Sequence, residues 1–197
     1  ARGRGDVYKR QDMGFRIKLL GVSQMTSSGL EQRMSPCLVP TDSPLGQLEG
    51  GTNMIVIEGD QVGQIVLRGA GAGEGPTASA VVSDITDIAR GISLATFGQP
   101  AKTLKKASSS KSQTPAPYYL RMLLHDEPGA LAKITKILSQ FNVSIDRMRQ
   151  YGHEDENAPV LIVTHEIRYE DLMMAIQELP NTKVLKAQPL AIRIEAV

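Results

Sequence analysis

The chain has 197 residues, a net charge of +1, one cysteine and no tryptophan. This length allows one large domain or two small ones, and a single cysteine excludes an internal disulfide and a zinc site built from several thiolates. The 41% hydrophobic and 22% charged fractions are typical of a folded globular protein. No segment has the roughly 20 apolar residues of a membrane span or the shape of a secretory leader, so we expect a cytoplasmic protein without a membrane partner.

The positive charge lies in two short segments. Residues 1–11 contain four basic side chains and one acidic one, and residues 99–117 contain four lysines and no acidic residue. The longer segments 12–98 and 118–197 are both net acidic. Because a protein that binds a phosphate backbone needs positive charge on a folded surface, we expect no nucleic-acid partner.

The first eleven residues show no apolar periodicity. We expect residues 1–11 to be disordered, or to be an artefact translated from a joining sequence. The following Asp12-Met13-Gly14 is typical of a position inside a protein. The sequence therefore predicts a piece of a longer chain.

The segment 12–98 is expected to begin with strands. Alternating or continuous apolar residues predict four of them, at 15–22, 30–39, 53–58 and 64–68. Pro36 interrupts the second segment, which is therefore an edge strand, a bulged strand or two shorter strands. The turn residues Gly59-Asp60 join the last two strands into a hairpin.

A helix is expected at 77–91. Six apolar residues recur there at helical spacing: Ala78, Val81, Val82, Ile85, Ile88 and Ala89. Pro76 suits the first helical turn, where a missing N–H costs nothing, and Gly91 suits the end of the helix.

Residues 99–117 contain almost no large apolar side chain, so we expect a flexible linker and a domain boundary there. The segment 118–197 beyond it has the order β-α-β-β-α-β. Its strands are expected at 118–124, 143–150 and 160–165, and at 183–187 and 190–195 as two short strands or one bulged strand. Its helices are expected from the turn at 126–129 to Asn142, and at 169–179. This order predicts a ferredoxin-like sheet with both helices on one face.

The glycine run 69–75 follows a strand and precedes a helix, the place where a dinucleotide-binding loop occurs. Its spacing, G-x-G-x-G-x-G, differs from the G-x-G-x-x-G of the Rossmann fingerprint, and no acidic residue follows at the required distance. It is therefore not the main nucleotide cradle. Glycines at a helix N-terminus could still contact the amide, ribose or phosphate of a cofactor held by another domain, and the alternative is a tight turn.

The sequence LHDEPGAL, residues 124–131, forms the first strand-to-helix turn of the C-terminal segment. Asp126 or Glu127 could cap the helix, and Gly129 lets a small ligand approach the backbone. The free N–H groups of such a turn suit an amino-acid carboxylate, and the alternative is simple capping.

No other constellation predicts a catalytic or metal site. The three histidines lie in three different elements without metal-ligand spacing, and the acidic residues 154–156 beside His153 are typical of a solvated loop. Cys37 lies in an apolar run with no nearby base, so we expect a buried thiol rather than a nucleophile. We therefore assign no metal ligand.

Several blocks of the first segment resemble the later part of the catalytic domain of homoserine dehydrogenase. They are GFRIKLL (14–20), PCLVP (36–40), Asn53 with EGD (58–60), and GAGAG (69–73) followed by PTASAVV (76–82) and Asp84. Residues 118–197 resemble the ACT domain that many bacterial members of that family carry after a linker. The resemblance implies an α+β fold: a partial mixed-sheet substrate and dimerisation domain, then a ferredoxin-like ACT regulatory domain.

The resemblance implies an oxidoreductase that interconverts L-aspartate 4-semialdehyde and L-homoserine with NADP or NAD, on the route to threonine, methionine and isoleucine. In this family the last glycine of GAGAG, here Gly73, lies against the cofactor, and we add Gly71 and Thr77 as neighbours. The ACT resemblance implies an amino-acid effector, threonine first, held by Asp126, Gly129 and Ala130. A homo-oligomer, dimer or tetramer, is expected.

The family's nucleotide-binding domain and the segment with its catalytic lysine have no counterpart in these residues. Lys18, the one lysine in 12–98, lies on a strand that does not correspond to the catalytic one. We therefore assign no catalytic residue and expect no dehydrogenase activity from the chain alone. The alternatives are a stand-alone amino-acid-binding ACT module and a purely structural fragment.

Overall fold

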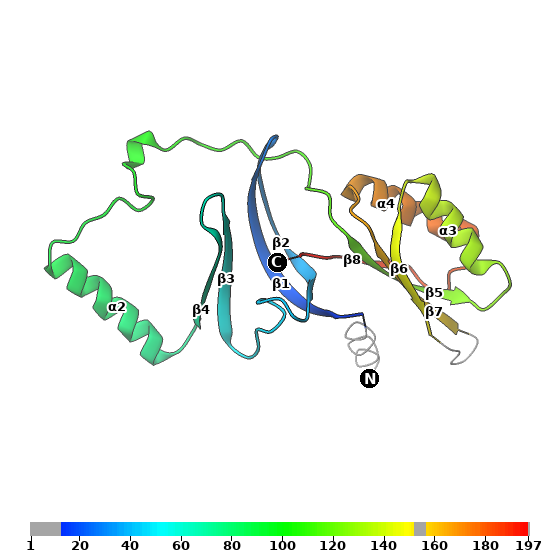
Figure 1. Ribbon diagram of the computed structural model, residues 1–197, viewed down its shortest axis with the longest axis horizontal. Helices are drawn as coiled ribbons and strands as arrows, with labels where there is room; N and C mark the ends of the chain where they lie inside the picture. The colour runs from blue at the N-terminus through cyan, green and yellow to red at the C-terminus, as the bar shows by residue number, and fades with distance from the viewer. Residues whose placement is uncertain (1–12, 152–156, 197) are drawn as a thin grey trace.

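The computed structural model describes residues 13–151 and 157–196 (Figure 1). The segment 1–11, His153 and the acidic residues 154–156, discussed above, lie outside the described residues. In the described part no helix is long and apolar enough to cross a membrane. The fold is α+β, as expected, and its strands form three separate sheets.

Two antiparallel hairpins make up the first half of the chain. Strands β1 (Phe15–Thr26) and β2 (Gly29–Pro40) pair along their whole length, and β3 (Thr52–Gly59) pairs with β4 (Gly63–Ala70). A mixed sheet was expected for this part. The structure has these two hairpins there, each an antiparallel two-stranded sheet, and within the described residues they do not pair with each other. Pro36 lies opposite Leu19 without interrupting β2, because a strand of a two-stranded sheet has a free edge where a missing N–H costs nothing.

Helix α2 (Glu74–Ala89) follows β4 with the expected terminal residues. Pro76 lies in its first turn, and Gly91 just beyond its end has a φ of 72°. The chain then continues through 99–117, where the regular structure is one 3-10 turn, η1 (Ala101–Thr103). This segment passes over the tip of the β1–β2 hairpin (Figure 1), where Leu30 N donates to Ser108 O and Ser110 N donates to Leu30 O.

The second half has the predicted β-α-β-β-α-β order. Its elements are β5 (Tyr118–His125), α3 (Ala130–Gln140), β6 (Ile145–Gln150), β7 (Asn157–Thr164), α4 (Tyr169–Glu178) with the 3-10 turn η2 (Leu179–Thr182), and β8 (Leu190–Arg193). The sheet order β6-β7-β5-β8, with every pair antiparallel, confirms the ferredoxin-like fold. Leu185 forms a separate bridge to Leu124, so the last strand region is divided rather than continuous.

Helices α3 and α4 cover one face of this sheet (Figure 1). Their apolar stripes supply Ile134, Leu138 and Leu172, all with no exposed surface, and the sheet supplies alternate residues such as Leu120 and Ile162. The alternation of β5 and β7 therefore sends one set of side chains into this core and the other set to the opposite face.

The opposite face of the sheet packs against the base of the β1–β2 hairpin. The residues of this second core come from both halves of the chain: Met13, Phe15, Leu38, Tyr119, Leu161, Val163 and Ile194. Beyond β8, Ile194 forms a parallel bridge with Leu38, and Glu195 N donates to Leu38 O at 2.8 Å. The two halves are thus joined by packing and by backbone pairing as well as by residues 99–117.

The first half exposes much of its apolar surface. Helix α2 contains no buried residue, and Ile88 on its apolar stripe is 75% exposed. Leu19 and Met34 on β1 and β2, and Ile55 on β3, are also largely exposed. Helix α2 stands apart from the rest of the chain (Figure 1). Large exposed apolar faces of this kind mark surfaces that pack against another body.

Candidate functional sites

The glycine run turns the chain from β4 into α2. Gly73, with φ 127° and ψ 149°, precedes the helix, and Thr77 N donates to Gly73 O at 3.1 Å within its first turn. A side chain at Gly71 would overlap the side-chain amide of Asn53 on β3, so this glycine leaves room for the Asn53 side chain just after β4. The predicted residues Gly71, Gly73 and Thr77 therefore lie together at one end of α2, and all three are exposed.

The first turn of α2 has no side-chain cap, so the N–H groups of Glu74 and Gly75 have no acceptor from a capping side chain, and Pro76 has no N–H group. Gly75 has open space where a side chain would extend. The acidic residue of this turn is Glu74, and its carboxylate repels a phosphate. These residues fit an uncharged part of a cofactor, an amide or a ribose, better than its phosphates.

The turn between β5 and α3 borders a cavity of about 310 Å³. Asp126, Gly129 and Ala130, the three residues predicted from the sequence, all line it. Gly129 has φ 83° and precedes α3, which has no side-chain cap. Because no atom lies within 4 Å of the place of a Gly129 side chain, the backbone here is open toward the cavity.

The turn itself is held by backbone hydrogen bonds. Glu127 N donates to His125 O at 3.0 Å, and Ala130 N donates to Glu127 O at 3.2 Å. Glu127 also pairs with Lys133 at 3.2 Å, but both side chains are about half exposed, so the pair contributes little to stability. The cavity therefore joins an uncapped helix N-terminus, which suits a carboxylate, to acidic side chains, which suit an ammonium group.

Gln150 also lines this cavity, although the sequence pattern at 124–131 did not predict it. It is the last residue of β6, which runs parallel to β5 two strands away in the sheet. The carboxyl ends of β5 and β6 therefore lie at the same edge. The predicted ferredoxin-like fold contained this signal, because its first two strands run parallel.

The remaining chemistry-bearing residues do not form a site in the described part of the chain. The thiol of Cys37 has no exposed surface and lies beside Ser35, which confirms a buried thiol. The ammonium group of Lys18 donates a hydrogen bond to the carbonyl oxygen of Leu48. No cluster of three metal-ligating side chains occurs among residues 13–151 and 157–196.

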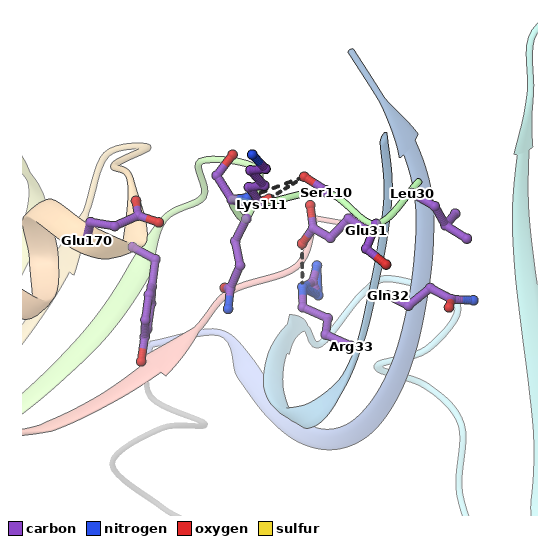
Figure 2. A pocket seen from close by; sticks show the side chains of 11 residues that line it. Leu30, Glu31, Gln32, Arg33, Ser110, Lys111 and Glu170 are labelled. Atoms are coloured by element: carbon purple, nitrogen blue, oxygen red, sulfur yellow. Dashed lines mark hydrogen bonds and ion pairs between the residues drawn. The ribbon is translucent and has the colours of Figure 1, made fainter. Parts of the chain in front are cut away.

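A second, polar cavity of about 380 Å³ lies where β2, residues 109–113 and the start of α4 meet (Figure 2). Its β2 wall contains Glu31 and Arg33, which are paired at 3.1 Å. Burial alone raises the pKa of Glu31, but hydrogen bonds from Thr114 and the charges of Arg33 and Arg193 outweigh it and hold that pKa below its usual value of 4.5. Glu31 is therefore a buried carboxylate kept ionised by its neighbours.

Comparison with known proteins matches both halves. The family model for homoserine dehydrogenase covers residues 3–86, and that for the ACT domain covers residues 118–181. The first match begins within the segment 1–11 that the sequence analysis sets aside. The homoserine dehydrogenase of Neisseria gonorrhoeae is 36% identical over 200 residues, which cover 98% of this chain, and that of Helicobacter pylori is 35% identical over 193 residues, which cover 96%.

The chain belongs to the homoserine dehydrogenase family. It spans 46% of the length of the Neisseria relative and 45% of the Helicobacter one. A solved homoserine dehydrogenase from Thiobacillus denitrificans superposes on 98% of this chain with a TM-score of 0.85 at 32% identity, and the chain covers 45% of it. The Staphylococcus aureus enzyme, at 21% identity and a TM-score of 0.61, shares the fold.

The superposition with the Thiobacillus denitrificans structure includes the elements with exposed apolar faces. Since the superposition takes in 98% of the chain, α2 and the β3–β4 hairpin stand where the corresponding elements stand in a longer protein. Exposed apolar faces of this size are candidate packing surfaces.

Proposed function

We propose that this chain is the cofactor-contacting and regulatory portion of a homoserine dehydrogenase. The whole enzyme interconverts L-aspartate 4-semialdehyde and L-homoserine with NADP or NAD, in the biosynthesis of threonine, methionine and isoleucine. In this proposal residues 12–98 belong to the catalytic domain, 99–117 form a linker and 118–197 form the ACT domain. A cytoplasmic location and a homo-oligomer accompany it. The observation that carries the proposal is the 36% identity to the Neisseria enzyme over nearly the whole chain.

The role proposed for the glycine run is to contact the nicotinamide cofactor, which supplies or accepts the hydride. Gly73 would lie against it, with Gly71 and Thr77 beside Gly73. The uncapped first turn of α2 supports this role, because its N–H groups can donate to the cofactor's amide or ribose. Glu74 in that turn supports a contact away from the phosphates.

The role proposed for the cavity at the β5–α3 turn is to bind an amino-acid effector, threonine first. The first-turn N–H groups of α3 beyond Ala130 would hold the carboxylate of the ligand, and Asp126 would hold its ammonium group. Gly129 and Ala130 leave the backbone accessible, and Gln150 can hydrogen-bond a polar side chain.

A test of the enzymatic proposal joins residues 13–197 to the part of the Neisseria gonorrhoeae homoserine dehydrogenase that this chain does not cover. We expect the hybrid to oxidise NADPH with aspartate semialdehyde, and the chain alone to be inactive. An inactive hybrid that is folded, or an active isolated chain, would contradict the assignment.

A test of the regulatory proposal is calorimetry of the full chain with L-threonine, L-methionine and L-isoleucine. We expect Gly129→Asn to abolish binding without unfolding the domain, because asparagine tolerates a positive φ but its side chain fills the cavity. The matched control is Gly50→Asn, a glycine with φ 67° and open space, which should bind normally. Binding by the Gly129 variant would place the ligand elsewhere.

The alternative is a stand-alone amino-acid-binding module. It predicts effector binding without any activity of the hybrid. The exposed stripe of α2 argues against it, because a complete module has no reason to expose Val82, Ile85 and Ile88 together.

A further inference from the structure

Four charged side chains meet where the catalytic portion contacts the ACT domain. Glu31 and Arg33 come from β2, Arg193 ends β8, and Glu195 lies two residues further. The four side chains are between 5% and 14% exposed. We call these four residues the junction cluster; Figure 2 shows its Glu31–Arg33 pair.

Glu195 is the centre of the junction cluster. One of its oxygens, Oε1, accepts from Arg33 Nη2 at 2.6 Å and from Arg193 Nε at 2.6 Å. A single carboxylate therefore holds together two buried guanidinium groups from opposite sides of the interface. Its removal would leave two like charges buried without their shared partner.

The other contacts of the junction cluster are hydrogen bonds to Thr114, near the end of the segment 99–117. Glu31 Oε2 accepts from Thr114 N at 2.9 Å and from Thr114 Oγ1 at 2.7 Å, and Arg193 Nη1 donates to Thr114 O at 2.8 Å. Arg33 Nη1, by contrast, is buried without a hydrogen-bond partner within the described structure. A partly satisfied buried network of this kind is sensitive to small displacements of its members.

Strand β5 connects the cluster to the effector cavity. At its first residue, Tyr118 OH accepts from Arg193 Nη1 at 3.3 Å, and at its far end Leu124 and His125 line the cavity. Because β5 is paired with β7 on one side and β8 on the other, we expect it to shift together with the sheet rather than as a single strand. We therefore expect a displacement of β5 at the cavity to shift the junction cluster at its other end.

The covalent route between the two halves is poorly suited to carry such a displacement. It passes through α2, which has no buried residue, and through residues 99–117, which are mostly exposed. The contacts across the junction, in contrast, are buried and reach β2 directly.

We propose that the junction cluster is the device that couples amino-acid binding in the ACT domain to the β1–β2 hairpin of the catalytic portion. This inference rests on the proposed function for its ligand. Occupation of the cavity shifts β5 and β8, and the shared bonds of Glu195 pass that shift to Arg33 on β2. The junction cluster is thus a positioning element and touches neither substrate nor cofactor.

The test follows hydrogen exchange of the β2 amides in the full chain with and without saturating L-threonine. We expect threonine to change exchange in β2 by about fivefold or more in the wild type. In Glu195→Gln this response should be lost, while calorimetry shows a Kd within about threefold of the wild-type value. The matched control is Glu49→Gln, which removes the carboxylate of an exposed pair with Arg16 and should keep the full response.

Thr114→Val provides a milder variant should Glu195→Gln fail to fold, since it removes one hydrogen bond to Glu31 and no charge. We expect it to weaken the β2 response without abolishing binding. Threonine binding that leaves β2 exchange unchanged in the wild type, or a response that persists in both variants, overturns the coupling alone. Absence of binding to the wild type by threonine, methionine and isoleucine overturns the effector proposal and the coupling with it.

Discussion

Glu31 shows how a single buried carboxylate depends on its neighbours. It lies within the junction between the two halves, 5% exposed, and remains ionised because Thr114 and two arginines stabilise its charge against the cost of burial. The sequence contained no signal for this arrangement, since Arg33 and Glu195 are 162 residues apart and no local spacing joins them. Spacing identifies sites formed within one turn, such as the 126–130 cavity wall, but not sites formed by docking.

The lowered pKa of Glu31 predicts an acid-sensitive junction. Because the folded-state pKa lies below the usual 4.5, this carboxylate stabilises the fold above that pH, and the contribution is lost as pH falls through the folded value. In urea unfolding measured from pH 6 to pH 3, Glu31→Gln should start less stable than the wild type and lose less stability on acidification. Parallel curves for the two proteins would show that Glu31 does not carry the effect.

At the scale of elements, hydrophobic periodicity predicted both α2 and α3 but could not tell what covers them. In α3 the stripe is buried against the sheet, whereas in α2 the same kind of stripe is exposed. Pro36 is a similar case, since three alternatives fit the sequence and only the pairing of β2 with a single long partner decides for an uninterrupted strand. Type and position of an element follow from local residues, and its environment follows from the rest of the molecule.

Truncation of one residue in each helix measures this difference. Leu138→Ala in α3 removes a side chain with no exposed surface and should lower the free energy of unfolding by about 2–5 kcal/mol. Ile88→Ala in α2 removes a side chain that is 75% exposed and should change it by less than about 0.5 kcal/mol, since alanine also favours helix. Chemical denaturation of both variants checks the prediction, and a large loss for Ile88→Ala would mean that α2 is packed in solution.

At the scale of the whole molecule, the chain divides into a half with its own core and a half without one. The ACT domain buries its helices against its sheet, and the base of the β1–β2 hairpin shares in the second core on the far face. The remainder, from β3 to α2, superposes on a longer homoserine dehydrogenase and has exposed apolar faces in this chain. The charge does not distinguish the two halves, since 12–98 and 118–197 are both net acidic and the basic excess lies in 1–11 and 99–117.

This division predicts that one double variant of α2 has opposite effects in the isolated chain and in the whole enzyme. Val82→Ser with Ile85→Ser removes two apolar side chains from α2 that are each 60% exposed. In the isolated chain these exposed groups promote self-association, so the double variant should be more soluble and bind less of a hydrophobic dye. In the hybrid with the rest of the Neisseria enzyme the same groups should be buried, and the variant should unfold at lower temperature by the equivalent of about 2–5 kcal/mol. Equal unfolding temperatures for the hybrid with and without the two substitutions would show that the apolar stripe of α2 is not an interface within the enzyme.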